Sequence, residues 1–217
     1  MKLLSRKSLT ITAAIAVLGG LSIAAAPSQA ASPAHRSTAA HSSTAAHEGL
    51  TDQDLAKLPL TDRHLTRHER HNLAVVLRDY YVAEGNHIDV PTFVNSFTKD
   101  GVFNDMVPGV AYRGEALGNV LPYMAGLFPD VHRELKRITV NGDVISIELS
   151  IQGTFEGPLQ SPAGTVKPNG AKVDVPTADF WYLKDGKVEQ FNCFVGYSTM
   201  YKQMGVDFDW ASAVDNH

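Results

Sequence analysis

One turn constrains the fold of this chain more than any other feature, the dipeptide Asn141-Gly142. Asn-Gly favours the tight turns that join two antiparallel strands, because both residues tolerate a positive φ. Here it connects residues 135–140 to residues 144–155. The second stretch has an apolar residue at every other position: Ile145, Ile147, Leu149 and Ile151. Since neighbouring side chains of a strand point to opposite faces, this pattern predicts a sheet with one face on a core and the other face polar.

A second hairpin is predicted in residues 175–205, which we interpret as two strands joined at Asp185-Gly186. Short aromatic and β-branched runs flank this dipeptide, which also tolerates positive φ. Asp179 lies in the middle of the first strand. Burying an unpaired carboxylate is costly, so this residue is expected to face either water or a pocket.

Strand alternation decides which residues would share a face with Asp179. If Asp179 points inward, Trp181 points inward too, whereas Phe180 and Tyr182 point to the opposite face. A carboxylate beside an indole in apolar surroundings is expected to have a raised pKa, because desolvation disfavours its charged form. Such a base can remove a proton from the carbon beside a carbonyl, provided that a hydrogen-bond donor stabilises the enolate.

A long helical pattern precedes the strands. Thr66 and Glu69 have capping-box spacing and Gly85 is a natural stop, so a helix is expected to run to Glu84. Its apolar face has the spacing of a helix that packs on a core: Leu73, Val76, Leu77 and Tyr80.

Three histidines are predicted on the opposite face of this helix: His64, His68 and His71. Their spacings of four and three residues would allow them to hold a zinc ion. They also suit a solvated, pH-sensitive surface, because this face lies away from the apolar stripe. We favour the second interpretation and predict no metal site.

Two further helices are expected. Asp89 as N-cap and Pro91 in the first turn predict a short helix through Phe97. Residues 114–127 have helical periodicity, and Pro122 is expected to kink or split that helix because proline lacks the backbone donor.

The order of these patterns predicts the fold class. After the second helix, a strand from Val102 is expected to carry Asn104 and Asp105 into a turn, and residues 157–170 form a Gly/Pro-rich loop. Helices followed by a run of strands predict an α+β fold, in which helices lie against one face of a curved antiparallel sheet.

The first thirty residues have the pattern of a cleaved export signal. An apolar run follows the basic residues Lys2, Arg6 and Lys7, and it ends in small residues up to Ala30. A permanent membrane anchor is the alternative, because the apolar run has nearly the minimum spanning length. The signal predicts a secreted or periplasmic protein that has no membrane contact after cleavage.

Four segments follow from the composition. Residues 1–30 are the expected signal, residues 31–56 a flexible tether rich in Ala, Ser and His, residues 57–210 the folded domain, and residues 211–217 a tail. The tether cannot bury enough apolar surface to offset its ordering entropy. Cys193 is the only cysteine, so stability must come from a packed core and not from an intrachain disulfide.

The composition also excludes several functions. The formal charge is −4 and the sequence has no basic stripe, so no attraction to nucleic acid is expected. We find no phosphate-binding loop, nucleophile elbow or clear metal cluster. Any chemistry is therefore expected to be proton transfer without a cofactor.

Several short motifs follow one another in order: Phe128-Pro129-Asp130, Asn141-Gly142-Asp143, Gly153-Thr154-Phe155-Glu156-Gly157, Val175-Pro176, and Asp179 ahead of Lys184-Asp185-Gly186-Lys187-Val188-Glu189. Together they resemble the SnoaL-like branch of the nuclear transport factor 2-like superfamily, over about residues 65–205. The resemblance implies a cone-shaped α+β half-barrel whose curved sheet and helices enclose one pocket. Such proteins include polyketide cyclases, ketosteroid isomerases, dehydratases and hydrolases, and also proteins without catalysis, so the fold does not select the function.

The resemblance also implies a role for one residue. In the cyclases of this branch an aspartate serves as acid/base on the strand that matches residues 178–183, and Asp179 falls at that position. A histidine in the motif Gly-Thr-His-Thr-Gly often points into the same pocket, whereas this chain has Phe155 there.

We predict Asp179 and His132 as catalytic residues. Further side chains are expected to contact the ligand: Trp181, Tyr80, Tyr112, Tyr123, Phe155, Asn192 and Asp105. Simpler interpretations remain open for several of them. Tyrosines at helical spacing are often core residues with a satisfied hydroxyl, and a histidine after a helix end often serves as a cap.

Two residues of the second hairpin have structural alternatives. Asp179 is alternatively a buried carboxylate bonded to a backbone amide, to Arg133 or to Arg137. A bulge would decide whether Asn192 or its neighbour Cys193 faces inward, and Cys193 is interpreted as a small buried apolar residue.

Three functions are compatible with these patterns. In the first, the pocket binds a small, largely apolar carbonyl compound, which a cofactor-independent enzyme isomerises, cyclises or hydrates through Asp179. In the second, the same pocket binds a ligand without turning it over. In the third, the outer sheet face with Phe180 and Tyr182 forms a homodimer.

Overall fold

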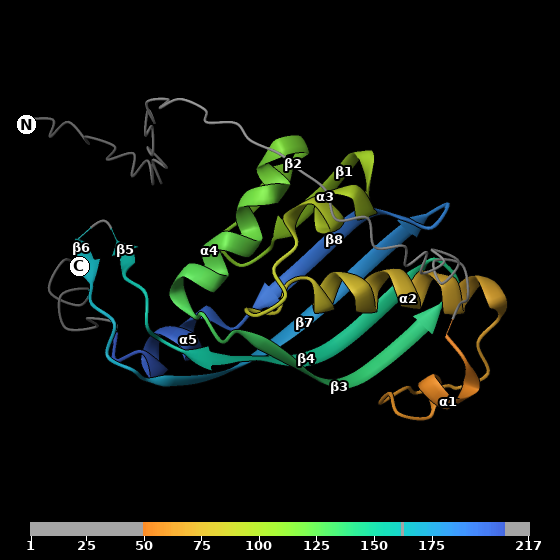
Figure 1. Ribbon diagram of the computed structural model, residues 1–217, viewed down its shortest axis with the longest axis horizontal. Coiled ribbons are helices and arrows are strands. Elements are labelled where there is room, and N and C mark those ends of the chain that lie inside the picture. The colour runs from red at the N-terminus through yellow and green to blue at the C-terminus, as the bar shows by residue number, and fades with distance from the viewer. Residues whose placement is uncertain (1–49, 162, 207–217) are drawn as a thin grey trace, which may run out of the picture. The chain divides into compact units, whose positions relative to one another are not determined.

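The computed structural model describes residues 50–161 and 163–206 (Figure 1). The predicted signal, most of the predicted tether and the C-terminal tail lie outside these residues. The helices and strands are α1 (Asp52–Leu55), α2 (Arg67–Tyr81), α3 (Val90–Ser96), β1 (Phe97–Asp105), β2 (Val110–Arg113), a 3₁₀ helix (Gly114–Asn119), α4 (Val120–Leu127), β3 (His132–Asn141), β4 (Val144–Thr154), β5 (Leu159–Ser161), β6 (Gly164–Val166), β7 (Lys172–Lys184), β8 (Lys187–Val195) and α5 (Tyr197–Gln203).

A curved, unclosed sheet of six strands in the order β2-β1-β8-β7-β4-β3 forms the body of the domain. Helices α2, α3 and α4 lie on the same face of this sheet (Figure 1). This arrangement confirms the predicted α+β class and the cone-like architecture. No described helix has both the length and the apolar character needed to span a bilayer.

One pairing corrects the expectation of a purely antiparallel sheet. β1 pairs with β8 in parallel, whereas the other neighbours in the sheet are antiparallel. Turn residues report only on strands that follow each other in the chain. They carry no information on a pairing such as Phe103 with Phe191, which joins residues far apart in the sequence.

Both predicted hairpins are present. The Asn141-Gly142 turn joins β3 to β4, and β3 begins at His132, three positions earlier than expected. At the β7–β8 turn, Asp185 and Gly186 have φ values of 51° and 70°. These positive values match the type I′ turn that such dipeptides favour.

Several element boundaries differ from the prediction. α2 ends at Tyr81, before the turn in which Gly85 donates a backbone hydrogen bond to Val131 at 2.7 Å. A Cβ on Gly85 would lie 2.0 Å from the Pro129 oxygen, so this close approach requires glycine. α3 ends at Ser96, and Phe97 already begins β1.

The predicted break at Pro122 occurs just before it, because Pro122 lies in the first turn of α4, where its missing donor costs nothing, and the preceding segment is a 3₁₀ helix. Two further segments were predicted wrongly. The loop after Gly157 contains the small β5–β6 hairpin, and residues 197–203, expected as strand, form helix α5.

The apolar face of α2 packs on the sheet as predicted. Leu73 and Val76 are fully buried, Tyr80 is 6% exposed, and Leu77 is partly buried. The predicted capping box is also present, since Thr66 and Glu69 exchange hydrogen bonds. Glu69 additionally accepts a hydrogen bond from the Gly142 backbone at 2.9 Å, which fixes α2 to the β3–β4 hairpin.

Replacing Glu69 by Ala is expected to lower the free energy of unfolding by about 1–2 kcal/mol, because it removes one half of the cap and the Gly142 hydrogen bond. Urea titration measures the change. Glu115→Ala removes an exposed glutamate without such contacts and serves as the control. Equal stabilities of the two variants would contradict this role of Glu69.

The three histidines do not form one helical face. His64 precedes α2, whereas His68 Nε2 lies 2.6 Å from Asp143 Oδ1, so His68 also attaches α2 to the β3–β4 hairpin. Asn72 donates to the same Asp143 oxygen at 2.9 Å. Among the described residues, no group of three or more His, Cys, Asp or Glu side chains is arranged to hold a metal ion.

The outer sheet face carries the residues that alternation placed there. The rings of Phe180 and Phe194 meet edge to face, with centroids 5.8 Å apart. Arg137 and Glu148 form an exposed ion pair at 3.1 Å nearby. A homodimer through this face stays a prediction.

Candidate functional site

A cavity of about 80 Å³ lies between the helices and the inner face of the sheet. β1, β7 and β8 supply one wall, α2 and α4 supply others, and Tyr197 of α5 contributes from the end of β8. Most of its lining is apolar or aromatic. The described residues of the lining include three carboxyl groups and one guanidinium group: Asp79, Asp105, Asp179 and Arg133.

Three of the lining residues form a row across adjacent strands. In the sheet register, Cys193 of β8 pairs with Asp105 of β1 on one side and with Asp179 of β7 on the other. All three side chains are buried and line the cavity. The register therefore places two carboxyl groups on either side of one thiol.

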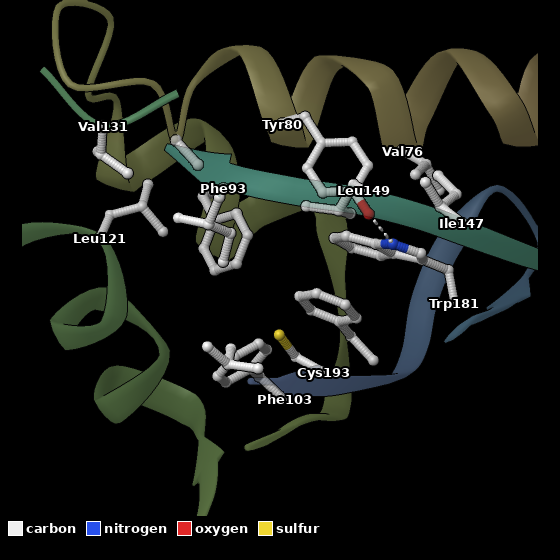
Figure 2. Packing of buried hydrophobic residues seen from close by; sticks show 14 of the residues in the cluster. Val76, Tyr80, Phe93, Phe103, Leu121, Val131, Ile147, Leu149, Trp181 and Cys193 are labelled. Carbon is white, nitrogen blue, oxygen red and sulfur yellow. Dashed lines mark hydrogen bonds between the residues drawn. The ribbon is translucent and has the colours of Figure 1, made fainter. Parts of the chain in front are cut away.

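Asp179 is the deepest carboxyl group of the row. Its Oδ2 accepts a hydrogen bond from the Tyr80 hydroxyl at 2.7 Å, and the same hydroxyl accepts one from Trp181 Nε1 at 3.0 Å. Figure 2 shows the second bond, between the edge of the indole and the Tyr80 oxygen. Trp181 is itself held by Phe191, whose ring stacks on it with centroids 3.6 Å apart. The other oxygen of Asp179 has no hydrogen-bond partner.

The surroundings of Asp179 raise its pKa to about 6. Burial is the main cause, because desolvation disfavours the carboxylate, and the nearby Asp105 acts in the same direction. The Cys193 thiol, the Tyr80 hydroxyl and the more distant charge of Arg133 oppose the rise. Asp179 is thus a carboxyl group that changes its protonation close to neutral pH.

Asp79 is a second buried carboxyl group on the cavity wall. It is 1% exposed, and its Oδ2 accepts a hydrogen bond from Ser96 at 2.6 Å. Desolvation raises its pKa to about 7, although Ser96 and the positive charges of Arg78 and Lys187 act against the rise. Its Oδ1 has no hydrogen-bond partner.

Asp105 and Tyr197 form a pair at the end of the row. The Tyr197 hydroxyl donates to Asp105 Oδ2 at 2.5 Å, and Oδ1 of Asp105 has no hydrogen-bond partner. Burial raises the pKa of Asp105, and the hydrogen bond from Tyr197 opposes this. Burial, with the hydrogen bond to Asp105, also raises the pKa of Tyr197, so its hydroxyl stays protonated as a donor.

The predicted arginine partners of Asp179 bind other groups. Arg133 lines the cavity, but its Nη1 donates to the Ala83 oxygen at 2.9 Å and lies 3.4 Å from Glu84. Arg137 lies on the outer face with Glu148. The direct partner of Asp179 is Tyr80, which was predicted only as a ligand contact.

Most of the predicted site residues meet at the cavity, namely Asp179, Trp181, Tyr80, Tyr112, Tyr123 and Asp105. Three others lie elsewhere. His132 is exposed at the start of β3, and its ring lies 3.3 Å from the Asp130 oxygen. Phe155 is fully buried against Phe128, outside the lining.

Asn192 is the third residue that does not reach the cavity. It accepts a hydrogen bond from Asn104 at 2.8 Å on the outer face, because alternation turns Asn192 outward when Cys193 points inward. In Figure 2 the Cys193 sulfur points into the apolar cluster. The bulge that could have exchanged the two residues occurs between Tyr182 and Leu183.

Three further lining residues were not predicted to face a pocket: Asp79, Tyr197 and Arg133. Asp79 lies three residues after Val76 and directly before Tyr80, so helical spacing places it next to the buried face of α2. A carboxylate at that position was therefore a usable signal. No comparable sequence signal indicated Tyr197, because residues 197–203 were expected to form a strand.

The fold and the cavity define a class: an α+β cone with one inner pocket of aromatic and acidic side chains. The model of the SnoaL-like domain matches residues 77–191. This match covers more than half of the chain, which therefore belongs to the SnoaL-like family. No curated protein matches the chain.

Solved structures share the fold. A protein from Jannaschia sp. CCS1 that is named as a SnoaL-like polyketide cyclase is 22% identical, with a TM-score of 0.56 over 66% of this chain and 98% of its own. A protein from Bacillus cereus ATCC 10987, named as a polyketide cyclase, is 20% identical, with a TM-score of 0.55 over 69% and 91%. AclR of Streptomyces galilaeus, named as a hydroxylase, is 18% identical, with a TM-score of 0.55 over 65% and 89%. At these identities the similarity shows the fold alone.

Proposed function

We propose that the cavity binds a small, largely apolar carbonyl compound and that Asp179 acts on it as an acid/base. The observation that carries this proposal is the state of Asp179. It is 2% exposed, one of its oxygens has no partner, and its pKa is raised to about 6. General bases work best when their pKa lies near the working pH.

The proposed chemistry needs no cofactor. Asp179 takes a proton from the carbon beside the carbonyl, and the electron pair of that C–H bond forms the enolate as the carbonyl π electrons move to oxygen. The protonated Asp179 then returns the proton to another carbon, which gives an isomer. When the enolate carbon instead attacks a second carbonyl, a C–C bond closes a ring, and Asp179 returns its proton to the new alkoxide.

A donor must stabilise the enolate oxygen during this reaction. Tyr80 already donates to Asp179. Tyr112 and Tyr123 also line the cavity, and burial raises the pKa of both hydroxyl groups, so both remain protonated donors. Tyr123 is 55% exposed, which suits a residue at the mouth of the cavity. We therefore assign the donor role to these two tyrosines.

Exchange of the α-protons of cyclohexanone in D₂O tests the proposal. The full chain is expected to accelerate exchange over buffer, and the rate is expected to rise with pH around 6, because only ionised Asp179 acts as a base. NMR follows the loss of the α-proton signal. No acceleration by the protein, for cyclohexanone and for whatever carbonyl compound co-purifies with it, would overturn the catalytic role.

Binding without turnover is the second candidate function. Asp179 is buried and already accepts a hydrogen bond from Tyr80. This arrangement also suits a fixed polar contact in a binding site. In this case a ligand would raise the melting temperature and would be recovered chemically intact. Recovery of a rearranged or deuterated ligand would favour the enzyme.

We also propose that the protein is exported and acts outside the cytoplasm, which rests on residues 1–30 of the sequence. Cleavage is expected after Ala30 or Ala31. N-terminal sequencing of protein from the extracellular or periplasmic fraction tests this. A chain that retains Met1 and stays in the cytoplasm or membrane would contradict it.

A further inference from the structure

We propose that the ligand of this cavity carries a protonated amine, so that the cavity selects a small organic cation over a neutral molecule of the same shape. The inference rests on the proposed function, in which the cavity binds a small organic molecule. The new element is the positive charge of the ligand, which the proposed proton transfer does not determine.

Three carboxyl groups on the cavity wall each have one oxygen without a hydrogen-bond partner: Asp79, Asp105 and Asp179. They come from different elements, α2, β1 and β7, and their exposures are 1%, 8% and 2%. A buried acceptor without a donor is unfavourable by about 1–3 kcal/mol. The free oxygen of Asp79 lies 3.9 Å from Nη2 of Arg78 and so has a positive charge beside it. The free oxygens of Asp105 and Asp179, on either side of Cys193, therefore carry the argument, and they point to a ligand that brings N–H donors.

The charges of the lining favour a cation over an anion. Among the lining residues that the structure describes, Arg133 is the one basic side chain, and it already contacts the Ala83 oxygen and Glu84. The described residues contain no arrangement of three His, Cys, Asp or Glu side chains suited to a metal ion. An organic cation therefore fits the excess of negative charge better than a metal ion or an anion does.

Aromatic rings supply the rest of the recognition. The faces of aromatic rings attract cations, and this attraction increases when water is excluded. Trp181 and Phe191 stack on each other beside the row of Asp105 and Asp179, and Phe103 packs against Phe191 with centroids 4.7 Å apart. An ammonium group held by the carboxylates would thus have aromatic groups around its carbon substituents.

The size of the cavity limits the ligand to a small molecule. Its volume of about 80 Å³ is several times the roughly 10–15 Å³ that one water occupies on this scale. A compact ring with one amino group is a suitable probe. Cyclohexylamine meets this description, and cyclohexanone and cyclohexanecarboxylate have similar shapes with no charge and with a negative charge.

Calorimetric titration of the full chain at pH 8 with these three compounds tests the inference. Cyclohexylamine is expected to bind about 10- to 100-fold more tightly than cyclohexanone, the effect of one hydrogen bond between charged groups. Cyclohexanecarboxylate is expected to bind most weakly. Equal or tighter binding of the neutral or the anionic compound would overturn the inference.

Two variants connect the preference to the cavity. Asp105→Asn keeps an acceptor for Tyr197 but removes a charge, so it is expected to reduce the ratio of the affinity for cyclohexylamine to the affinity for cyclohexanone. Asp100→Asn removes an exposed carboxylate outside the lining and is expected to retain the full preference. An undiminished preference in Asp105→Asn would contradict the proposed cation site.

The outcomes separate this inference from the proposed function. Binding of cyclohexanone without any preference for the amine would overturn the inference and leave the carbonyl site intact. Binding of the amine alone would support the inference and contradict the carbonyl ligand. If none of the three compounds binds, the inference is overturned, and the proton-exchange experiment decides the proposed function separately.

Discussion

Asp179→Asn is expected to slow α-proton exchange by about 10²–10⁴-fold, the usual contribution of a general acid or base. The amide cannot take up a proton near neutral pH, but its oxygen can still accept the hydrogen bond from Tyr80. The amide nitrogen would occupy the position of the oxygen that has no partner now. The variant should therefore keep the fold and the cavity while it loses the base.

Two measurements make this result specific. Circular dichroism and urea titration at pH 8 should show a folded protein at least as stable as the wild type, because the substitution removes a buried charge. Tyr182→Phe, on the outer face of the same strand, should retain the wild-type exchange rate. If Asp179→Asn exchanges protons as fast as Tyr182→Phe, Asp179 is not the base.

The full chain is expected to be more stable at pH 5 than at pH 8, by about 3–4 kcal/mol in the free energy of unfolding. The folded-state pKa values of Asp79 and Asp179 are raised to about 7 and about 6 from 3.8. Between pH 4 and 7 the folded protein therefore binds more protons than the unfolded chain. Stability decreases as the pH rises through this window and is constant with respect to these groups above it.

Asp79→Asn is expected to remove the larger part of the stability difference between pH 5 and pH 8. Asp79 accounts for about 2–3 kcal/mol between pH 5 and pH 8, so the variant should show only the remaining difference. The Ser96 hydroxyl can donate to the new amide oxygen as it does to Asp79. Urea titrations at both pH values, with Asp100→Asn as the exposed control, measure the change. Equal stability of the wild type at pH 5 and pH 8 would contradict the prediction that Asp79 and Asp179 are buried and uncharged at pH 5.

Local turn chemistry made much of the fold predictable. Asn141-Gly142 and Asp185-Gly186 specify hairpins by their own backbone preferences, and the structure contains both. The α2 cap at Thr66 was predictable for the same reason. Helix α5 was not, because the aromatic and β-branched residues of the 197–203 segment favour a strand in isolation, and its packing beside β7 decides otherwise.

The positions of candidate site residues were predictable wherever the alternation of side chains along one strand was enough to decide which face they occupy. Asp179 and Trp181 share the inner face, as alternation requires. His132 and Asn192 do not lie at the cavity as predicted. Their orientation depends on where each strand begins and on its register, and a shift by one residue reverses the face. Asp105 and Asp179 could not be placed on either side of Cys193 from the sequence, since the pairing of β1 with β8 has no local signal.

The position of β8 has a consequence for the order in which the domain forms during synthesis. Of the described strands, β8 is the last to leave the ribosome, yet it lies between β1 and β7 in the sheet. Until it is made, β1 with β2 and β3 with β4 and β7 are two separate pieces, and neither has the wall between Asp105 and Asp179. Contacts between residues this far apart form slowly. We therefore expect the six-stranded sheet, and with it the cavity, to form only after β8 has been synthesised.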